Sequence, residues 1–470
     1  MPSIINIGSM AATGFGFTKT SLGGANYFLG VFTYPSTETQ NGSNYITSDS
    51  SGNLYVVLQL EPISTGLNYI VVIKLTPSGT IVWQQKFYNS VDQIFANSIT
   101  VSSSGYIAIS GNYYLNSAAN LYPFLIVLNN SGSLQFSRYL TPSSGSNNGY
   151  DAQFDSSGNV YLLGSYQNSG GYNKIGITKF SSSGTKTWDY YWSDTFTSTN
   201  GFNAQSFILD SSNNINVATE YNVNAYSQGG ILQVNSSGTE TWEDVYGSTS
   251  SNSKPLQSFG SGVDSSNNVY VTNQGGYNNT GAVLSVIKYN SSGTTQWTSA
   301  WLNSQAFSQY VQSSNGNGAT DSSGNTFVSF YYSLASNHST VYGGWVKVNS
   351  SGSSVFGRYL GVGANNILNI NKYSISPTGD IYFSFVATPI LDSGRDPNPC
   401  IAVLPGDGSL TGTYTLSGAT FTYGSLSVTS ETFTPPNLGS ITSRGTSSQT
   451  NTTPTVSSTT GSTSLTTVVV

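Results

Sequence analysis

Charged side chains are scarce in this chain of 470 residues. Only 7% of the residues are Asp, Glu, Lys or Arg, against about a quarter in ordinary soluble domains. The 14 Lys and Arg residues are spread thinly and the net charge is −6, so the chain lacks the basic stripe that binds phosphate backbones. We therefore expect no nucleic-acid partner. A surface kept soluble by hydroxyl and amide groups suits an extracellular or particle-bound protein.

Cysteine and histidine are almost absent. The single cysteine, Cys400, excludes a disulfide within the chain, and the single histidine, His338, lies in a polar loop. No C-x-x-C, H-x-x-x-H or H-E-x-x-H pattern offers a zinc site, and no G-x-S-x-G elbow presents a serine nucleophile. The sequence therefore predicts no cofactor, no metal site and no catalytic residue, and hence a protein that is not an enzyme.

Long apolar runs are missing as well. No run approaches the 18 apolar residues that suggest a membrane-spanning helix. The N-terminus has no basic segment before Lys19 and no apolar core of the kind found in signal peptides. An extracellular type of surface without an export signal is typical of proteins released by host lysis, such as virion components. A mature chain that has lost its signal is the alternative, although Met1 argues against it.

Glycine is plentiful, and it returns at a fixed period. A turn of the type D-S-S-G-N has its glycine, or an asparagine in its place, at Gly52, Gly105, Gly158, Asn213, Asn267, Gly324 and Gly379, at intervals of 53, 53, 55, 54, 57 and 55 residues. A second turn follows in step, with Gly79, Gly132, Gly184, Gly238, Gly293, Gly352 and Gly408. Two hairpin turns in each unit imply four strands in each unit.

These repeats predict an all-β fold, a seven-bladed β-propeller with four antiparallel strands per blade. The expected blades are residues 41–90, 91–142, 143–195, 196–248, 249–304, 305–362 and 363–417. Together with residues 25–40 they form one domain (25–417), flanked by an N-terminal arm (1–24) and a Ser/Thr-rich C-terminal arm (418–470).

Two sets of repeated residues are expected to hold the blades together. The turn aspartates should bond to the backbone of their own turns; they are Asp49, Asp155, Asp210, Asp264 and Asp321. A calcium ring is the alternative, but the spacing lacks alternating ligands. Aromatic residues four positions after the second-turn glycine should fill the gaps between blades; they are Trp83, Phe136, Trp188, Trp242, Trp297 and Phe356. The acidic loop Asp392–Asn398 contains Arg395, which argues against calcium there.

The phrase D-S-S-G-N-V-Y, followed by an apolar strand, S-S-S-G-T and Trp, resembles the bacterial and archaeal seven-bladed propeller repeats known as SBBP repeats. The resemblance covers about Asn41 to Ser417. Blade two departs from it with Ser102 in place of the aspartate, and blade seven has no aromatic residue four positions after Gly408. The resemblance implies the fold and says little about activity, because such repeats serve in surface proteins of diverse role.

The seam of the ring and the two arms remain to be placed. Residues 27–34 have the offset of a fourth strand and are candidates for the outer strand of blade seven, beside or instead of residues 410–416. The Ser/Thr-rich composition of the C-terminal arm favours disorder, and neither arm has the apolar periodicity to form a core of its own. We therefore expect other protein subunits to hold the arms.

Aromatic residues supply the candidate binding surface. The chain has 32 tyrosines, and the pairs Tyr113-Tyr114, Tyr190-Tyr191 and Tyr331-Tyr332 are candidates for stacking against a surface glycan. Packing inside the blades is the alternative that we favour for them.

Three functions compete. We favour a non-enzymatic structural or attachment component of a virion, which explains the missing signal, the missing catalytic residues and the arms together. The alternative is a cell-surface or secreted adhesin. A glycan-active enzyme comes last, because no pair of convergent carboxylates is apparent in the sequence.

Overall fold

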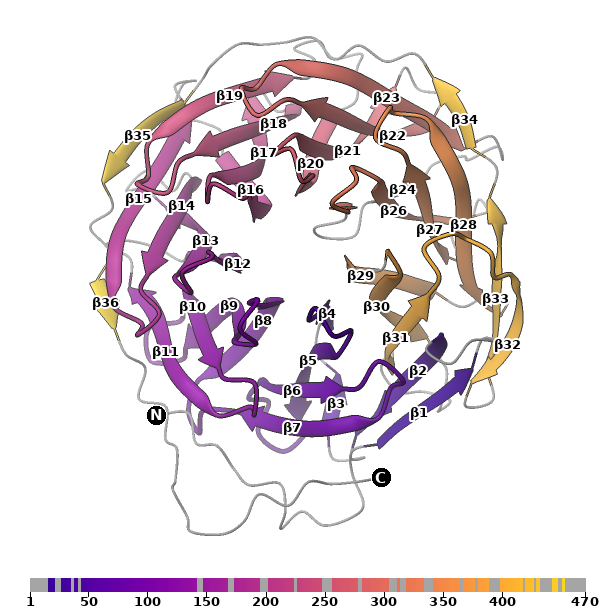
Figure 1. Ribbon diagram of the computed structural model, residues 1–470. Helices are drawn as coiled ribbons and strands as arrows, with labels where there is room; N and C mark the ends of the chain where they lie inside the picture. Colours follow the sequence, from indigo (N-terminus) through magenta and orange to yellow (C-terminus); the bar gives the residue numbers. More distant parts are fainter. Residues whose placement is uncertain are drawn as a thin grey trace.

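The computed structural model of the chain is a ring of seven four-stranded antiparallel sheets around one axis (Figure 1). The predicted fold class is confirmed, and the described residues contain no helix. The structure describes residues 16–21, 27–34, 38–40, 44–141, 147–167, 173–194, 202–223, 226–246, 256–277, 281–303, 311–312, 318–333, 341–363, 367–376, 379–388, 398–416, 419–426, 428–431, 442–446 and 450–452.

Each blade begins with its first strand at the axis and ends with its fourth strand at the rim (Figure 1). Blades one to three are β4 to β7 (Tyr45–Ser48, Leu54–Pro62, Tyr69–Leu75, Ile81–Phe87), β8 to β11 (Gln93–Val101, Ile107–Leu115, Asn120–Leu128, Leu134–Thr141) and β12 to β15 (Gly149–Phe154, Val160–Gln167, Asn173–Phe180, Lys186–Asp194). Blades four and five are β16 to β19 (Phe202–Leu209, Ile215–Val223, Tyr226–Val234, Glu240–Tyr246) and β20 to β23 (Leu256–Val263, Val269–Tyr277, Gly281–Tyr289, Thr295–Asn303).

The last two blades are less regular. Blade six is β25 to β28 (Gly318–Thr320, Thr326–Ser333, Val341–Val348, Ser354–Val362), with β24 (Val311–Gln312) also paired to β26. Blade seven contains β29 to β31 (Ile367–Ile375, Ile381–Thr388, Asn398–Leu404). A single parallel bridge, Val341 to Ile367, joins these two blades. In blade one, β3 (Glu38–Gln40) pairs antiparallel with the last residues of β5, beyond the part of β5 that pairs with β4.

The turns form because their central residues tolerate a left-handed backbone. Gly158 has a φ of 79°, and Asn213 takes its place in the next blade with a φ of 60°. Asparagine is one of the few residues with a side chain that adopts this conformation readily. The turn sequence therefore fixes where each hairpin reverses, and with it the register of every blade.

The third strands lie at the centre of the core. All seven residues of β6 are buried, because a blade is covered on both faces by its neighbours. Side chains of blade one, such as Tyr55 and Val57, share one apolar cluster with Ile107 and Ile109 of blade two. The core of the protein is thus a series of layers between blades.

Each blade also contacts the next one through an aromatic ring placed against a glycine. A Cβ atom at Gly184 would lie 2.6 Å from Cγ of Phe136, and one at Gly293 would lie 2.5 Å from Cδ2 of Trp242. Gly132, Gly352 and Gly408 lie against Trp83, Trp297 and Phe356 in the same way. The indole nitrogen of Trp188 donates to the carbonyl of Ser236 in the next blade at 3.2 Å. The six repeat aromatics therefore lie between blades.

The ring is closed by the N-terminal strand β2 (Phe28–Thr33). It pairs antiparallel with β31 and is the fourth strand of blade seven. Residues 412–416 are not in blade seven: they form β32, which pairs with β33 beside blade six. Phe28 supplies the aromatic residue that blade seven lacks after Gly408, since a Cβ atom at Gly79 of blade one would lie 2.8 Å from its Cζ.

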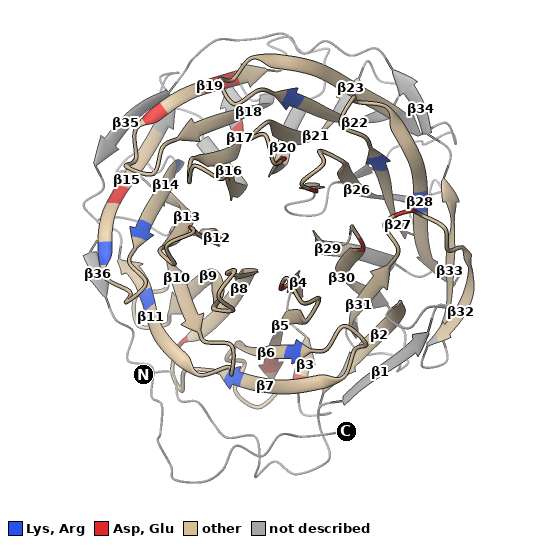
Figure 2. Cartoon of the chain, viewed as in Figure 1, with Lys and Arg blue, Asp and Glu red and all other residues tan. Residues whose placement is uncertain are grey.

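Lysines recur at one position of the third strand in four blades (Figure 2). Each of four lysines lies over an aromatic ring, with 4.8 to 5.1 Å from Nζ to the ring centre; they are Lys74, Lys179, Lys288 and Lys347. The ammonium of Lys347 donates to the carbonyl of Gly406 in the next blade at 2.7 Å. Four of the few cations in this chain therefore contribute to packing inside the ring.

The described parts of the two arms pair with the chain's own blades. Strand β1 (Gly16–Ser21) pairs with β2. Outer strands from the C-terminal arm pair with blades six, five, three and two; they are β33 (Ala419–Leu426), β34 (Val428–Glu431), β35 (Thr442–Thr446) and β36 (Thr450–Thr452). In these described strands the main-chain bonds run to open sheet edges of the same chain. The expectation that other protein subunits hold the arms stays a prediction.

No helix in the described part of the chain is long and apolar enough to cross a membrane.

We predict that Phe28→Ala lowers the free energy of unfolding by about 3–5 kcal/mol, as for other buried aromatic residues, because Phe28 is 2% exposed and anchors the seam. Phe136→Ala is the matched control, since Phe136 makes the same contact within the continuous part of the ring. Urea unfolding measures both. A clearly smaller loss for Phe28→Ala would show that the seam is held by other contacts.

We also predict that Gly184→Ala is more destabilising than Gly379→Ala. Both glycines have positive φ, 80° and 86°, which costs a residue with a side chain about 1–2 kcal/mol. Only Gly184 lies against an aromatic ring, whereas a Cβ atom at Gly379 would meet nothing within 4 Å. Equal losses of melting temperature would show that backbone strain, and not the aromatic contact, requires glycine.

Candidate functional site

The axis of the propeller is lined by the first strand of every blade. One position in these strands, four residues before the start of the D-S-S-G turn, has a different residue in almost every blade. It is Tyr45, Ser98, Asp151, Ser206, Gly260 and Lys372 in blades one, two, three, four, five and seven. The sequence of the turn that follows is nearly constant. The blades therefore share the turn, whereas the residue at this position differs from blade to blade.

A β-bulge precedes this position in five blades. The pairing of the first two strands shifts register between Ala96 and Ser98, and between Gly149 and Asp151. The same shift occurs before Ser206, Gly260 and Lys372. A bulge adds one residue to a strand and redirects the side chain that follows, and bulges of this kind are common beside functional sites.

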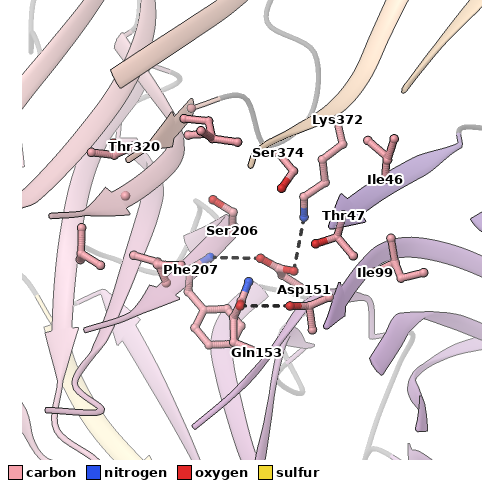
Figure 3. A pocket seen from close by; sticks show the side chains of 17 residues that line it. Ile46, Thr47, Ile99, Asp151, Gln153, Ser206, Phe207, Thr320, Lys372 and Ser374 are labelled. Atoms are coloured by element: carbon pink, nitrogen blue, oxygen red, sulfur yellow. Dashed lines mark hydrogen bonds and ion pairs between the residues drawn. The ribbon is translucent and has the colours of Figure 1, made fainter. Parts of the chain in front are cut away.

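Two of these side chains are charged, and they meet across the axis. Lys372 in β29 and Asp151 in β12 are the only charged residues in the seven first strands as the structure defines them. Their Nζ and Oδ1 atoms are 3.5 Å apart (Figure 3). Ser98 joins them, because Nζ donates to its Oγ at 2.8 Å and that Oγ donates to Oδ1 of Asp151 at 2.5 Å.

Asp151 is held by uncharged donors as well. Its Oδ1 accepts the backbone N–H of Ala152 at 2.9 Å, and its Oδ2 accepts that of Phe207 at 3.5 Å. The side chain of Asp151 is 2% exposed, against 18% for Lys372. Backbone N–H groups therefore hold the carboxylate of Asp151 in place, and the ammonium of Lys372 is the more accessible of the two charges.

The pair borders a pocket of about 250 Å³ on the axis (Figure 3). All seven first strands contribute to its wall. Uncharged polar side chains form one part of the lining, namely Thr47, Thr100, Gln153, Ser206, Thr320 and Ser374. Aliphatic and aromatic side chains form the rest, among them Ile46, Ile99, Phe207, Ile208 and Ile375. The pocket thus offers many hydroxyl and amide groups, one ammonium and one carboxylate.

This arrangement can hydrogen-bond a polar ligand and place one cation against it. A cation in a site enclosed by protein stabilises negative charge that develops on a ligand oxygen more strongly than it would in water. No catalytic residue was predicted from the sequence, and this group was missed. The signal was present: among repeated first strands almost free of charge, one aspartate and one lysine stand at the same repeat position.

The predicted turn aspartates lie away from this group, each within its own turn. Oδ1 of Asp155 accepts the N–H groups of Ser157 and Asn159 at 3.0 and 2.8 Å, and Oδ2 accepts Nδ2 of Asn159 at 2.8 Å. Asp49, Asp210, Asp264 and Asp321 repeat this pattern. Their oxygens bind their own turns.

Of the candidate glycan-stacking tyrosines, the four whose side chains the structure describes do not line the axial pocket. Tyr113 is 5% exposed and lies 5.1 Å from Tyr139, ring centre to ring centre. Its hydroxyl donates to Asp92 at 2.6 Å, and burial followed by this bond raises its pKa. Tyr114, Tyr190 and Tyr191 are half-buried, and the side chains of Tyr331 and Tyr332 lie outside the described residues.

Other residues considered from the sequence add nothing to the site. His338 and the loop residues Asp392, Arg395 and Asp396 lie outside the described residues. Cys400 is fully buried in β31, and burial raises the pKa of its thiol.

Solved structures similar to this chain are propellers. A polysaccharide lyase of family PL25, an ulvan lyase, has 11% identity and a TM-score of 0.48, with 78% of this chain and 95% of that chain covered. The propeller domain of the trilobed protease from Pyrococcus furiosus has 9% identity and a TM-score of 0.45, with 77% and 94% covered. No protein-family model and no curated protein matches the chain.

These neighbours correct the predicted function. The similar structures include polysaccharide lyases, so the prediction of a non-enzymatic virion component was wrong, and so was the prediction that the chain is not an enzyme. The fold that the resemblance to propeller repeats implied is confirmed. At these low identities the likeness itself extends to the fold alone.

We predict that the turn aspartate Asp264 makes the protein sensitive to acid. Burial alone would raise the pKa of Asp264, but hydrogen bonds from Asn268, Tyr270 and the backbone outweigh it, and the pKa lies below its ordinary value. A lowered folded-state pKa adds stability above the unfolded pKa of about 3.9, and this stability is lost as pH falls. Asp264→Asn should therefore destabilise the protein at pH 7 and do so less at pH 3. Urea unfolding at both pH values measures this, and an equal loss at both would contradict it.

Proposed function

We propose that this protein is a glycan-active enzyme whose active site is the axial pocket. The observation that carries the proposal is the single group Lys372–Ser98–Asp151, placed among uncharged hydroxyl and amide side chains. Polyhydroxylated ligands need many hydrogen-bonding groups and some apolar wall, and this lining offers both. The pocket is smaller than most drug-sized sites, which suits a sugar unit or the end of a chain.

Lys372 is the residue placed to contact the ligand. Its ammonium would stabilise negative charge that develops on a sugar oxygen during bond cleavage. Ser98 and Asp151 are positioning residues, because they hold the ammonium from below through bonds of 2.8 and 3.5 Å. Asp151 is the only carboxylate among the described lining residues, so the site is unlike a pair of carboxylates that hydrolyses glycosides.

A purely structural tie across the axis is the competing explanation for the same pair. The two explanations differ in what loss of the charge does. In an active site, removing the cation lowers turnover and leaves folding largely intact. In a structural tie, it lowers stability, and any loss of activity follows from unfolding.

We predict that Lys372→Met reduces glycan cleavage by about 10²-fold or more, the usual effect of removing one group that stabilises developing charge. The assay follows new chain ends released from a panel of neutral and acidic polysaccharides. The melting temperature should change little, because Asp151 keeps three uncharged donors.

Lys86→Met is the matched control. Lys86 forms another lysine–carboxylate pair, 3.8 Å from Glu38, with comparable exposure of 12% and 5%, but it does not line the axial pocket. Its loss should leave cleavage unchanged. If the wild-type protein releases no chain ends from any polysaccharide and binds none in calorimetry, or if Lys372→Met loses stability and activity in parallel, the proposal fails.

A further inference from the structure

One short motif recurs in the turns that the axial site does not use. The pattern N-x-S/T, in which the middle residue is not proline, occurs eight times in the sequence. Four of these asparagines begin the second turn of their blades; they are Asn129, Asn235, Asn290 and Asn349. This pattern is the acceptor sequence for N-linked glycans.

The four turns hold the motif in one geometry. Oδ1 of Asn235 accepts the N–H of Ser237 at 3.1 Å, the Oγ of Ser237 at 2.7 Å and the N–H of Thr239 at 2.9 Å. Asn129, Asn290 and Asn349 accept the same backbone bonds. Donors on Oδ1 draw electron density from the amide and make the protons on Nδ2 more acidic, which favours reaction at Nδ2.

The amide nitrogens of these four residues have no hydrogen-bond partner among the described residues. The first turns provide the contrast. Nδ2 of Asn159 donates to Asp155 at 2.8 Å, and Asn53, Asn214, Asn268 and Asn325 make the same bond. None of these five is followed two residues later by a serine or threonine. Blades four, five and six, which have an asparagine in both turns, therefore each have one occupied and one available asparagine nitrogen.

The second turns are also accessible. The two residues after each of the four asparagines are exposed. Asparagine is not needed to form the turn, because Thr76 and Ser181 accept the equivalent backbone bond in blades one and three at 3.0 and 3.1 Å. Four asparagines at positions where a hydroxyl suffices call for another explanation than the turn itself.

We propose that Asn129, Asn235, Asn290 and Asn349 are acceptors of N-linked glycans. A transferase would supply a sugar joined through its anomeric carbon to a phosphate. Nδ2 attacks that carbon, the C–N bond forms, the carbon–oxygen bond breaks, and the phosphate leaves with the electron pair. Nδ2 gives up one proton, which the departing phosphate takes up. The chain would then present sugars on one face of blades two, four, five and six.

Peptide mass spectrometry of the protein purified from the cells that naturally make it tests the proposal. We predict a glycan mass on the peptides with these four asparagines and none on those with Asn53, Asn159, Asn214, Asn268 and Asn325. Unmodified peptides at all four positions, or equal modification of the first-turn asparagines, would overturn it. Sugars found on the serines alone would also overturn it.

A pair of variants separates the motif from the turn. Ser131→Ala removes the hydroxyl of the motif but keeps the backbone bond of 3.1 Å from residue 131 to Asn129. It should reduce occupancy at Asn129 at least tenfold, whereas Ser131→Thr should retain it. An unchanged melting temperature for both variants shows that the turn is intact. Equal occupancy in the two variants would contradict the proposal, whether or not the axial pocket acts on glycans.

Discussion

The ring depends on one repeated contact, an aromatic side chain of one blade laid against the second-turn glycine of the next. A Cβ atom at that glycine would lie 2.5 Å from Trp242 and 2.6 Å from Phe136, so any side chain there would push the blades apart. The same glycine has a positive φ, which the hairpin requires. A single residue thus fixes both the turn within a blade and the distance between blades. Because this glycine recurs once in every repeat, successive blades pack in the same way.

The part of the fold that follows from local repeats could be predicted from the sequence, and of the long-range parts only the candidate outer strand at residues 27–34 was foreseen. The two glycine turns of each repeat predicted seven four-stranded blades. The sequence also signalled a gap, because blade seven lacks its aromatic residue after Gly408. Phe28 fills that position from the other end of the chain. Composition alone did not indicate the described strands of the C-terminal arm. Strands such as β35 (Thr442–Thr446) pair through main-chain bonds, which a Ser/Thr-rich sequence makes as well as any other.

The candidate site escaped prediction for a different reason. Motif searches look for chemistry at short spacing, whereas Lys372 and Asp151 are 221 residues apart and meet only because the ring closes. In a repeat protein the informative comparison is between blades. Positions that most blades share serve the scaffold, as the turn aspartates do. The position of Asp151 and Lys372 differs among blades, and there the side chains meet at the axis.

Lysines show this division most directly. Lys74, Lys179, Lys288 and Lys347 occupy one repeat position, and each lies over an aromatic ring. These four lysines stabilise the blades, and all four make the same kind of contact with an aromatic ring. Lys372 has no counterpart in the other first strands, and it extends from blade seven to Ser98 of blade two and Asp151 of blade three. In a chain with few charges, this cation stands at a position where the other blades have no lysine. Because enclosing charges in protein costs free energy even when they are paired, that departure from the repeat is the strongest physical reason to propose a function for the axis.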